Sequence, residues 1–127
     1  MALMITAAVF AQPAAALEPA RALASLPADS VTVTNYYKQN VYDQSDAKIG
    51  EIADVLVDKE GRVTALIVSV GGFLGAGEKD VAVPFNAIRH TEKNSKVYLT
   101  MDTTKDALKN APGFKYDKTT TKWVADK

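Results

Sequence analysis

The sequence predicts an all-β domain, a small β-barrel of short strands followed by one short C-terminal helix and an extended tail. Three observations support this prediction. Between residues 30 and 101, β-branched residues are dense, and turn-forming residues divide them into short runs. Two of these runs flank a tight turn at residues 58–61. Two later runs alternate apolar with polar residues, which is the period of a half-buried strand.

The first residues are typical of a leader and not of the barrel. Residues 2–11 are apolar but too few for a membrane span, which takes about 20 residues, and three alanines at 14–16 suit a signal-peptidase site. The first basic residue is Arg21, so either a longer leader has been trimmed or the run is a buried N-terminal helix. We expect residues 1–16 to be a signal peptide, which implies a periplasmic or secreted protein.

Residues 17–29 form a predicted linker, because Pro19 and Pro27 interrupt regular structure. The strand pattern begins after it. Val31 and Val33 alternate with threonines, and a short apolar pair follows at residues 41–42. The polar residues 43–46 then predict a turn.

Residues 49–57 and 63–70 predict a β-hairpin, with Gly61 placed to adopt positive φ in the turn. Apolar side chains occur on both faces of each strand, with Leu56 opposite Val55 and Leu66 opposite Ile67. A strand that is apolar on both faces must be covered on both faces. The barrel core covers one, and either the C-terminal segment or another subunit must cover the second. The second possibility predicts a homodimer.

Two more strands follow from clean alternation. Val81, Val83 and Phe85 share one face, and Val97, Leu99 and Met101 repeat the arrangement. Pro84 has no backbone N–H, which suits a strand end or a sheet edge. Residues 86–88 are expected to form a single turn. Together, residues 30–101 are the predicted barrel domain.

Residues 102–127 are predicted to form the helix and a basic, aromatic tail. Thr103 or Thr104 can cap a helix that groups Ala107, Leu108 and Ala111, and the proline and glycine at 112–113 then end it. Beyond them we expect a looser segment, in which three lysines alternate with Phe114, Tyr116 and Trp123. The aromatic rings either pack on the barrel while the lysines face water, or bind single-stranded nucleic acid.

The stretch GGFLGAGEKDVAVPF at residues 71–85 has the glycine spacing of a phosphate-binding loop, but Glu78 stands where that loop needs lysine. A strand pattern follows it instead of a helix, so no helix dipole faces an anion. We therefore predict a connection between two strands. Phe73 and Leu74 at this connection either cover the barrel mouth or contact a partner.

Composition argues against several classes of function. Lysine plus arginine and aspartate plus glutamate number 15 each, so no global field attracts nucleic acid or an anionic membrane. The chain has no cysteine and one histidine, His90, which excludes thiolate chemistry and leaves any metal to carboxylates. No nucleophile, base and oxyanion donor assemble in the pattern. The sequence therefore predicts no catalytic residue, no metal site and no cofactor.

The stretch IGEIADVLVDKEGRVTALIVSVGGFLGAGEKDVAVPF at residues 49–85 resembles the PRC-barrel domain, and the resemblance runs from about residue 30 to residue 101. Related barrels occur in the photosynthetic reaction centre H subunit and in a ribosome-maturation factor. The segment TKDALKNAPGFKY is similar to the extension of small exported members. The resemblance implies a barrel of about six strands, often dimeric, that serves as a binding or scaffolding module without catalytic residues.

The expected function is therefore that of an exported, non-enzymatic module that acts through protein–protein contact, as a homodimer and with a partner protein of the cell envelope. We expect no nucleic-acid partner and no transmembrane span in the mature chain. The alternative function is an RNA-associated factor that uses the barrel and the basic tail. The candidate contact residues are Phe73, Leu74, Lys79, Leu56, Leu66 and Trp123.

The leader makes a direct prediction. Intact-mass measurement of the exported protein should give a chain that begins near Leu17, because cleavage after the small residues at 14–16 removes the apolar run. A mature protein that still begins at Met1 would contradict it.

Overall fold

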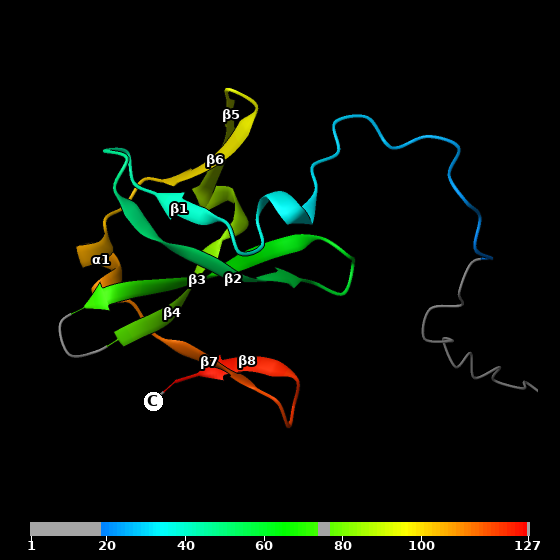
Figure 1. The fold of residues 1–127 in the computed structure, drawn as a ribbon. Helices are drawn as coiled ribbons and strands as arrows, with labels where there is room; N and C mark the ends of the chain where they lie inside the picture. Colours follow the sequence, from blue (N-terminus) through cyan, green and yellow to red (C-terminus); the bar gives the residue numbers. More distant parts are fainter. Residues whose placement is uncertain (1–18, 74–76, 127) are drawn as a thin grey trace, which may run out of the picture. The chain divides into compact units, whose positions relative to one another are not determined.

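The structure is a computed structural model and describes residues 19–73 and 77–126. The chain divides into two units, residues 1–30 and residues 31–127. In the first unit, residues 19–30 are exposed throughout, including the side chains of Leu23 and Leu26. The second unit contains all the strands (Figure 1).

Eight strands form one mixed sheet in the order β5-β6-β1-β2-β3-β4-β7-β8. The fold is mostly β with one short helix, so the predicted class is confirmed. Among the described residues no pairing joins β5 to β8, so the expected closure of the barrel by hydrogen bonds is not seen. The elements are η1 (Val33–Asn35), β1 (Asn40–Tyr42), β2 (Lys48–Val57), β3 (Val63–Phe73), β4 (Gly77–Pro84), η2 (Phe85–Ala87), β5 (Ile88–Lys93), β6 (Lys96–Met101), α1 (Lys105–Lys109), β7 (Phe114–Asp117) and β8 (Lys122–Ala125).

One hydrophobic cluster forms the core between β2–β4 and the strands β1, β5 and β6. The predicted stripes are confirmed, because Val81, Val83, Leu99 and Met101 are buried in it and Phe85 packs against it. Burial of each such side chain stabilises the fold by roughly 1.5–3 kcal/mol. Its members are Tyr36, Val41, Ile49, Ile52, Leu66, Val68, Val70, Val81, Val83, Ile88, Leu99 and Met101.

Two bulges in β2 turn its side chains toward this core. Val41 of β1 faces Gly50 while Tyr42 faces Lys48, which leaves Ile49 as an extra residue. On the other side of the strand, the pairing with β3 likewise skips Ala53. An extra residue increases the local bend and twist of a strand. The bulges therefore let Ile49 and Ile52 both enter the core, and they curl the sheet around it.

Gly50 lies where β2 and β3 approach too closely for a side chain. A Cβ atom at this position would lie 2.3 Å from the backbone oxygen of Ser69 and 3.2 Å from a methyl group of Val68. The glycine of the IGEI stretch is therefore required by the pairing of the two strands.

The turn between β2 and β3 forms as predicted. Gly61 has φ of 84°, and the Asp58 carboxylate accepts hydrogen bonds from the backbone N–H groups of Glu60 and Arg62, both at 2.9 Å. A carboxylate that bonds its own turn fixes the register of the hairpin.

Strand β5 was not expected from the sequence. Its residues IRHTEK contain one aliphatic side chain, Ile88, and show no apolar alternation. The strand forms because all six residues pair with β6. Asn94 and Ser95, the two residues between the strands, both have positive φ, which is the geometry of a tight hairpin turn.

The prediction of a strand from residue 31 onward is wrong. Residues 33–35 form the 3₁₀ turn η1, and Val31 and Val33 are more than half exposed. The Thr32 hydroxyl accepts a hydrogen bond from the N–H of Thr34 at 3.4 Å. Such local bonds from threonine compete with strand pairing, and the first strand therefore begins only at Asn40.

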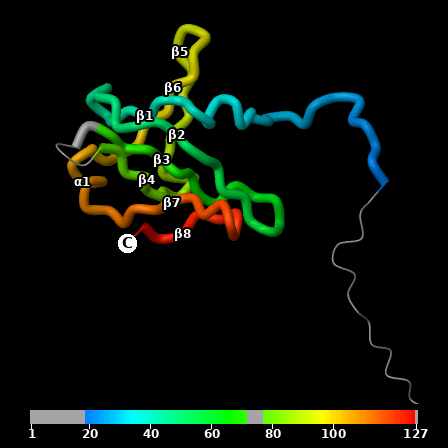
Figure 2. The backbone as a smooth tube through the Cα atoms, turned by 60° about the horizontal axis from the view of Figure 1, so that its bottom comes forward, coloured from blue at the N-terminus to red at the C-terminus, as the bar shows by residue number. Residues whose placement is uncertain are grey.

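The C-terminal residues are not a looser tail but a second β-hairpin. Strands β7 and β8 lie on the side of β2–β4 away from β1, as Figures 1 and 2 both show. Phe114 pairs with Asp80 of β4, and the indole N–H of Trp123 donates to the Asp54 carboxylate at 2.7 Å. Ile67 neighbours Asp54 in the sheet and is 1% exposed, although it does not belong to the core cluster. The C-terminal segment of the same chain therefore covers the second apolar face.

Helix α1 joins this hairpin to the sheet. Thr104 caps it, as predicted, by accepting from the N–H of Ala107 at 3.1 Å. Leu108 and Ala111 pack against the core, whereas Ala107, which was expected beside them, is exposed. The Lys79 ammonium of β4 donates to the backbone oxygens of Lys109 and Ala111, at 2.5 and 2.7 Å. A cation at the end of a helix satisfies carbonyls that lack a partner in the helix.

The close approach at Gly50 predicts that Gly50→Ala destabilises the domain by about 1–3 kcal/mol, the usual cost of overpacking. Chemical denaturation followed by circular dichroism measures it. Gly113→Ala is the control, because a Cβ atom there would meet Lys79 at an ordinary 3.6 Å. Equal stability of the two variants would contradict the account of Gly50.

The hydrogen bond between Trp123 and Asp54 predicts that Trp123→Phe lowers the stability of the domain. Trp123→Phe keeps an aromatic ring but removes the donor, and the partly buried carboxylate then loses one hydrogen bond. We expect a loss of about 1–3 kcal/mol in the free energy of unfolding. Tyr116→Phe, which removes an exposed hydroxyl, should change it little; the same loss in both variants would refute the role of the indole N–H.

Candidate functional site

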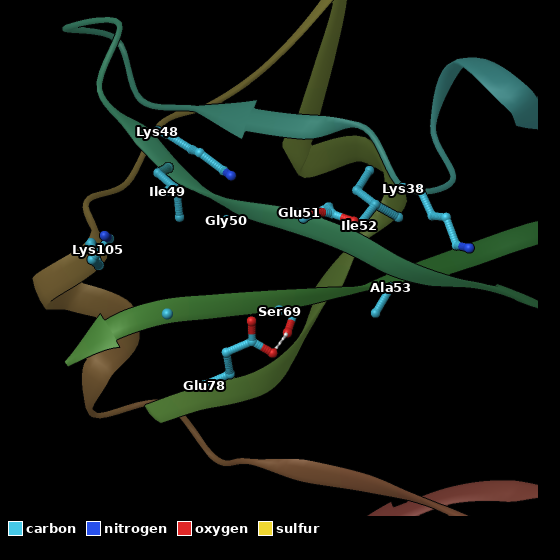
Figure 3. A pocket seen from close by; sticks show the side chains of 11 residues that line it. Lys38, Lys48, Ile49, Gly50, Glu51, Ile52, Ala53, Ser69, Glu78 and Lys105 are labelled. Carbon is cyan, nitrogen blue, oxygen red and sulfur yellow. Dashed lines mark hydrogen bonds between the residues drawn. The ribbon is translucent and has the colours of Figure 1, made fainter. Parts of the chain in front are cut away.

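A groove of about 450 Å³ lies on the outer face of β2–β4, with residues of β2, β3, β4 and α1 in its lining (Figure 3). Ser69 and Gly71 alternate with the core residues Val68 and Val70 along β3, so they face outward. Gly50 also lines the groove. The hollow exists because these side chains are small where a larger residue would fill the surface.

Five charged side chains surround this groove. They are Lys38, Lys48, Lys105, Glu51 and Glu78. Within residues 19–73 and 77–126, the ion pairs within 4 Å join Arg62 to Asp58 and Glu60. The five charges at the groove therefore have no oppositely charged partner within that distance in this part of the chain, and they remain solvated.

Among the described residues, one hydrogen bond between side chains of the lining joins Ser69 to Glu78. The Ser69 hydroxyl donates to the Glu78 carboxylate at 3.2 Å, and Figure 3 shows the two side chains facing each other. A serine beside a carboxylate does not make a nucleophile by itself, because acyl transfer also needs a positioned base and donors for the oxyanion. The lining of this groove contains no histidine. We therefore assign no catalytic role to Ser69.

His90 lies away from this groove. Its ring stacks on that of Tyr36, with 5.6 Å between the centroids, and Tyr36 in turn contacts Phe85. The Nε2 atom of His90 is buried without a hydrogen-bond partner among the described residues. Burial raises the pKa of the Tyr36 hydroxyl above its usual value. These rings form a packed aromatic group at the edge of the core.

The structure gives internal contacts to three of the six residues predicted to bind a partner. Leu66 is completely buried in the core, so its prediction as a contact residue is wrong: β3 turns it to the inner face. Leu56 is half-buried. Lys79 and Trp123 are engaged by the helix carbonyls and by Asp54. Their contacts hold the C-terminal segment to the sheet.

Of the two predicted contact residues Phe73 and Leu74, the structure describes only the backbone of Phe73. Strands β3 and β4 are antiparallel and the backbone of Phe73 pairs with Gly77, so the glycine stretch connects two strands as predicted. The side chain of Phe73 and the whole of Leu74 lie outside the described residues. Their role as a contact point stays a prediction.

Of the aromatic rings of the basic tail, that of Trp123 is turned toward the sheet, whereas Tyr116 stays 47% exposed. Tyr116 and Trp123 meet edge to face at 5.8 Å, and Trp123 is half-buried. Lys115, Lys118 and Lys122 are exposed. The half-buried Trp123 and the exposed lysines fit the packing alternative, whereas the exposed ring of Tyr116 does not.

The sequence pattern missed an apolar surface at one end of the domain. Val31, Val33 and Val57 are 58%, 57% and 57% exposed. The first two line a hollow of about 80 Å³ whose remaining residues are Thr32, Tyr36, Val55, Val63 and Phe85. We call these three valines and the hollow the apolar end. The alternation at residues 31–34 was the one available signal, and it indicated a strand instead.

The described part of the chain has neither a cluster of metal-binding side chains nor a helix that could span a membrane. Residues 19–73 and 77–126 contain no group of three or more histidine, cysteine, aspartate or glutamate side chains that could hold a metal ion. Nor does a helix of sufficient length and apolar character to cross a membrane occur there.

Comparison with known proteins identifies a family. No curated protein matches the chain. The family model of the PRC-barrel domain matches residues 28–108, which is more than half of the chain and includes β1 to β6 and most of α1. The curled sheet, the glycine-bounded β2–β3 hairpin and this match agree, and the chain belongs to the PRC-barrel domain family.

Proposed function

We propose that this chain is an exported, non-enzymatic binding or scaffold module that acts through protein–protein contact, and that the apolar end is its contact surface. The observation that carries the proposal is the exposure of Val31 and Val33, which line one small apolar hollow, and of Val57, whose strand partner Val63 also lines it. Contiguous exposed apolar side chains of this kind mark interaction sites in soluble proteins.

The energetics favour burial of this surface by a partner. Each valine contributes roughly 1.5–3 kcal/mol when it is fully transferred out of water. The hollow offers a pocket for a partner's side chain, and side chains in such pockets contribute most of the binding energy of an interface. A partner that covers the apolar end would therefore gain affinity from few residues.

The apolar end also changes the basis of the proposed homodimer. The sequence motivated a dimer through the second face of the β2–β3 hairpin, but β7 and β8 lie over that face. The apolar end is an uncovered apolar surface among the described residues of the domain, and we propose it as the contact for a second copy or for a protein of the cell envelope. The signal peptide predicted from the sequence of residues 1–16 supports export.

The proposal predicts the behaviour of a double variant. Val33→Ser combined with Val57→Ser should convert a dimer of the wild-type protein to a monomer at tens of micromolar concentration, because it removes apolar area from the contact. Size-exclusion chromatography with light scattering measures the mass. Val124→Ser, at a half-buried valine of the C-terminal hairpin whose strand partner Lys115 is exposed, is the control and should leave the dimer intact.

A photo-crosslinking amino acid at position 57 tests the same surface when the wild-type protein is a monomer. Adducts with an envelope protein should form from position 57 and be absent from position 124. A monomeric wild-type protein that gives no adduct specific to position 57 would refute the proposal.

A further inference from the structure

A second surface lies on the outer face of the strands β5, β6 and β1. The register aligns Arg89 with Thr100, and Thr100 with Tyr42, in one row across the three strands. Thr91 and Tyr98 form the next row. All five side chains are exposed or half-buried, while their neighbours along the strands, such as Val41 and Leu99, face the core.

One hollow lies on this face, and a second continues from it past the end of β6 toward η2 and α1; together we call them the furrow. Two hollows, of about 610 and 630 Å³, both have Gln44, Arg89 and Thr100 in their linings, so they meet at these residues. One hollow extends past Met101 toward Leu108, and the other extends past Tyr98 toward Lys93. The furrow therefore runs along the outer face and past the end of β6, and this elongated form suits an extended chain.

Two tyrosines form one wall of the furrow. The rings of Tyr42 and Tyr98 lie 6.3 Å apart and are tilted by 55°, so they present a notch instead of a flat stack. Tyr98 keeps 36% of its surface exposed. Tilted aromatic rings are the surface on which the rigid rings of proline pack in grooves that recognise proline-rich segments.

Unused hydrogen-bond donors lie beside these rings. Among the described residues, the side chains of Arg89, Gln44 and Asn86 take part in no side-chain hydrogen bond, although all three line the furrow. Arg89 stands where the two hollows meet, and its guanidinium offers several donors in one plane. A polyproline II chain has no internal hydrogen bonds, so its carbonyl oxygens require donors of this kind.

We propose that this furrow binds an extended, proline-rich segment of another protein in the polyproline II conformation. Proline rings pack against Tyr42 and Tyr98, and Arg89 with Gln44 donates to the backbone carbonyls of the segment. A polyproline II segment is ordered before it binds, so little conformational entropy is lost. The inference deepens the proposed protein-contact function but uses a surface separate from the apolar end.

The charges of the furrow favour a peptide over a nucleic acid. Arg89 and Lys93 are accompanied in the two linings by Asp43, Asp46 and Asp102. One oxygen of Asp43 is occupied by the backbone N–H groups of Ser45 and Ala47. A polyanion would meet these carboxylates and be repelled, whereas a peptide presents a neutral backbone to them.

Titration with an N-acetylated decaproline peptide, followed by amide chemical shifts of the labelled full chain, tests the proposal. We expect saturable shifts centred on Tyr42, Arg89, Tyr98 and Thr100. Tyr98→Ala and Arg89→Ala should each weaken binding about tenfold or more, which corresponds to about 1.4 kcal/mol. Tyr98→Phe should bind as the wild type does, because it keeps the ring. Tyr116→Ala, which removes an exposed tyrosine from the C-terminal hairpin, is the matched control and should also bind normally.

Several outcomes would overturn it. Decaproline that causes no saturable shifts would do so, as would equal binding of a glycine–serine peptide of the same length. Binding of single-stranded oligothymidylate that depends on Tyr98 would assign the furrow to nucleic acid instead. The Val33→Ser, Val57→Ser variant should still bind decaproline, so failure of the apolar end and failure of the furrow can be told apart.

Discussion

The central constraint on this protein is that β3 must be covered on both of its faces. Leu66, Val68 and Val70 point to one side and Ile67 to the other, and all four are buried. The bulged strand β2 curls the sheet so that β1 and β6 close over the inner side. The outer side must be covered by a segment that comes later in the chain. Without that cover, Ile67 would be exposed to water.

The segment that completes this burial is the C-terminal hairpin. It lies beyond residue 108, where the match to the family domain ends. Three contacts attach it to the sheet: the Lys79 ammonium on the end of α1, the pairing of Phe114 with Asp80, and the bond from Trp123 to Asp54. Two of the residues expected to contact a partner, Lys79 and Trp123, therefore serve the chain's own packing.

Two surfaces that the C-terminal hairpin does not cover are available for recognition. At the apolar end, Val31 and Val33 remain exposed because the segment around the 3₁₀ turn η1 does not pair with a strand. On the face of β5, β6 and β1, outward tyrosines and unbonded donors lie along a furrow. The groove over Ser69 is polar and solvated. The two proposed contacts thus use different chemistry, the first apolar burial and the second ring packing with hydrogen bonds.

The sequence alone determined the features that depend on local chemistry: the β2–β3 hairpin with Gly61 in its turn, the stripes through Val83 and Leu99, the Thr104 cap and the family. Only the tertiary structure decided which segment covers Ile67, that Leu66 faces inward, and that the polar run after Ile88 forms a strand. The alternation of apolar residues along a strand predicts that one face is apolar, but it does not predict which segment covers that face. That choice depends on pairings between residues far apart in the chain, such as Trp123 with Asp54, and no local pattern encodes them.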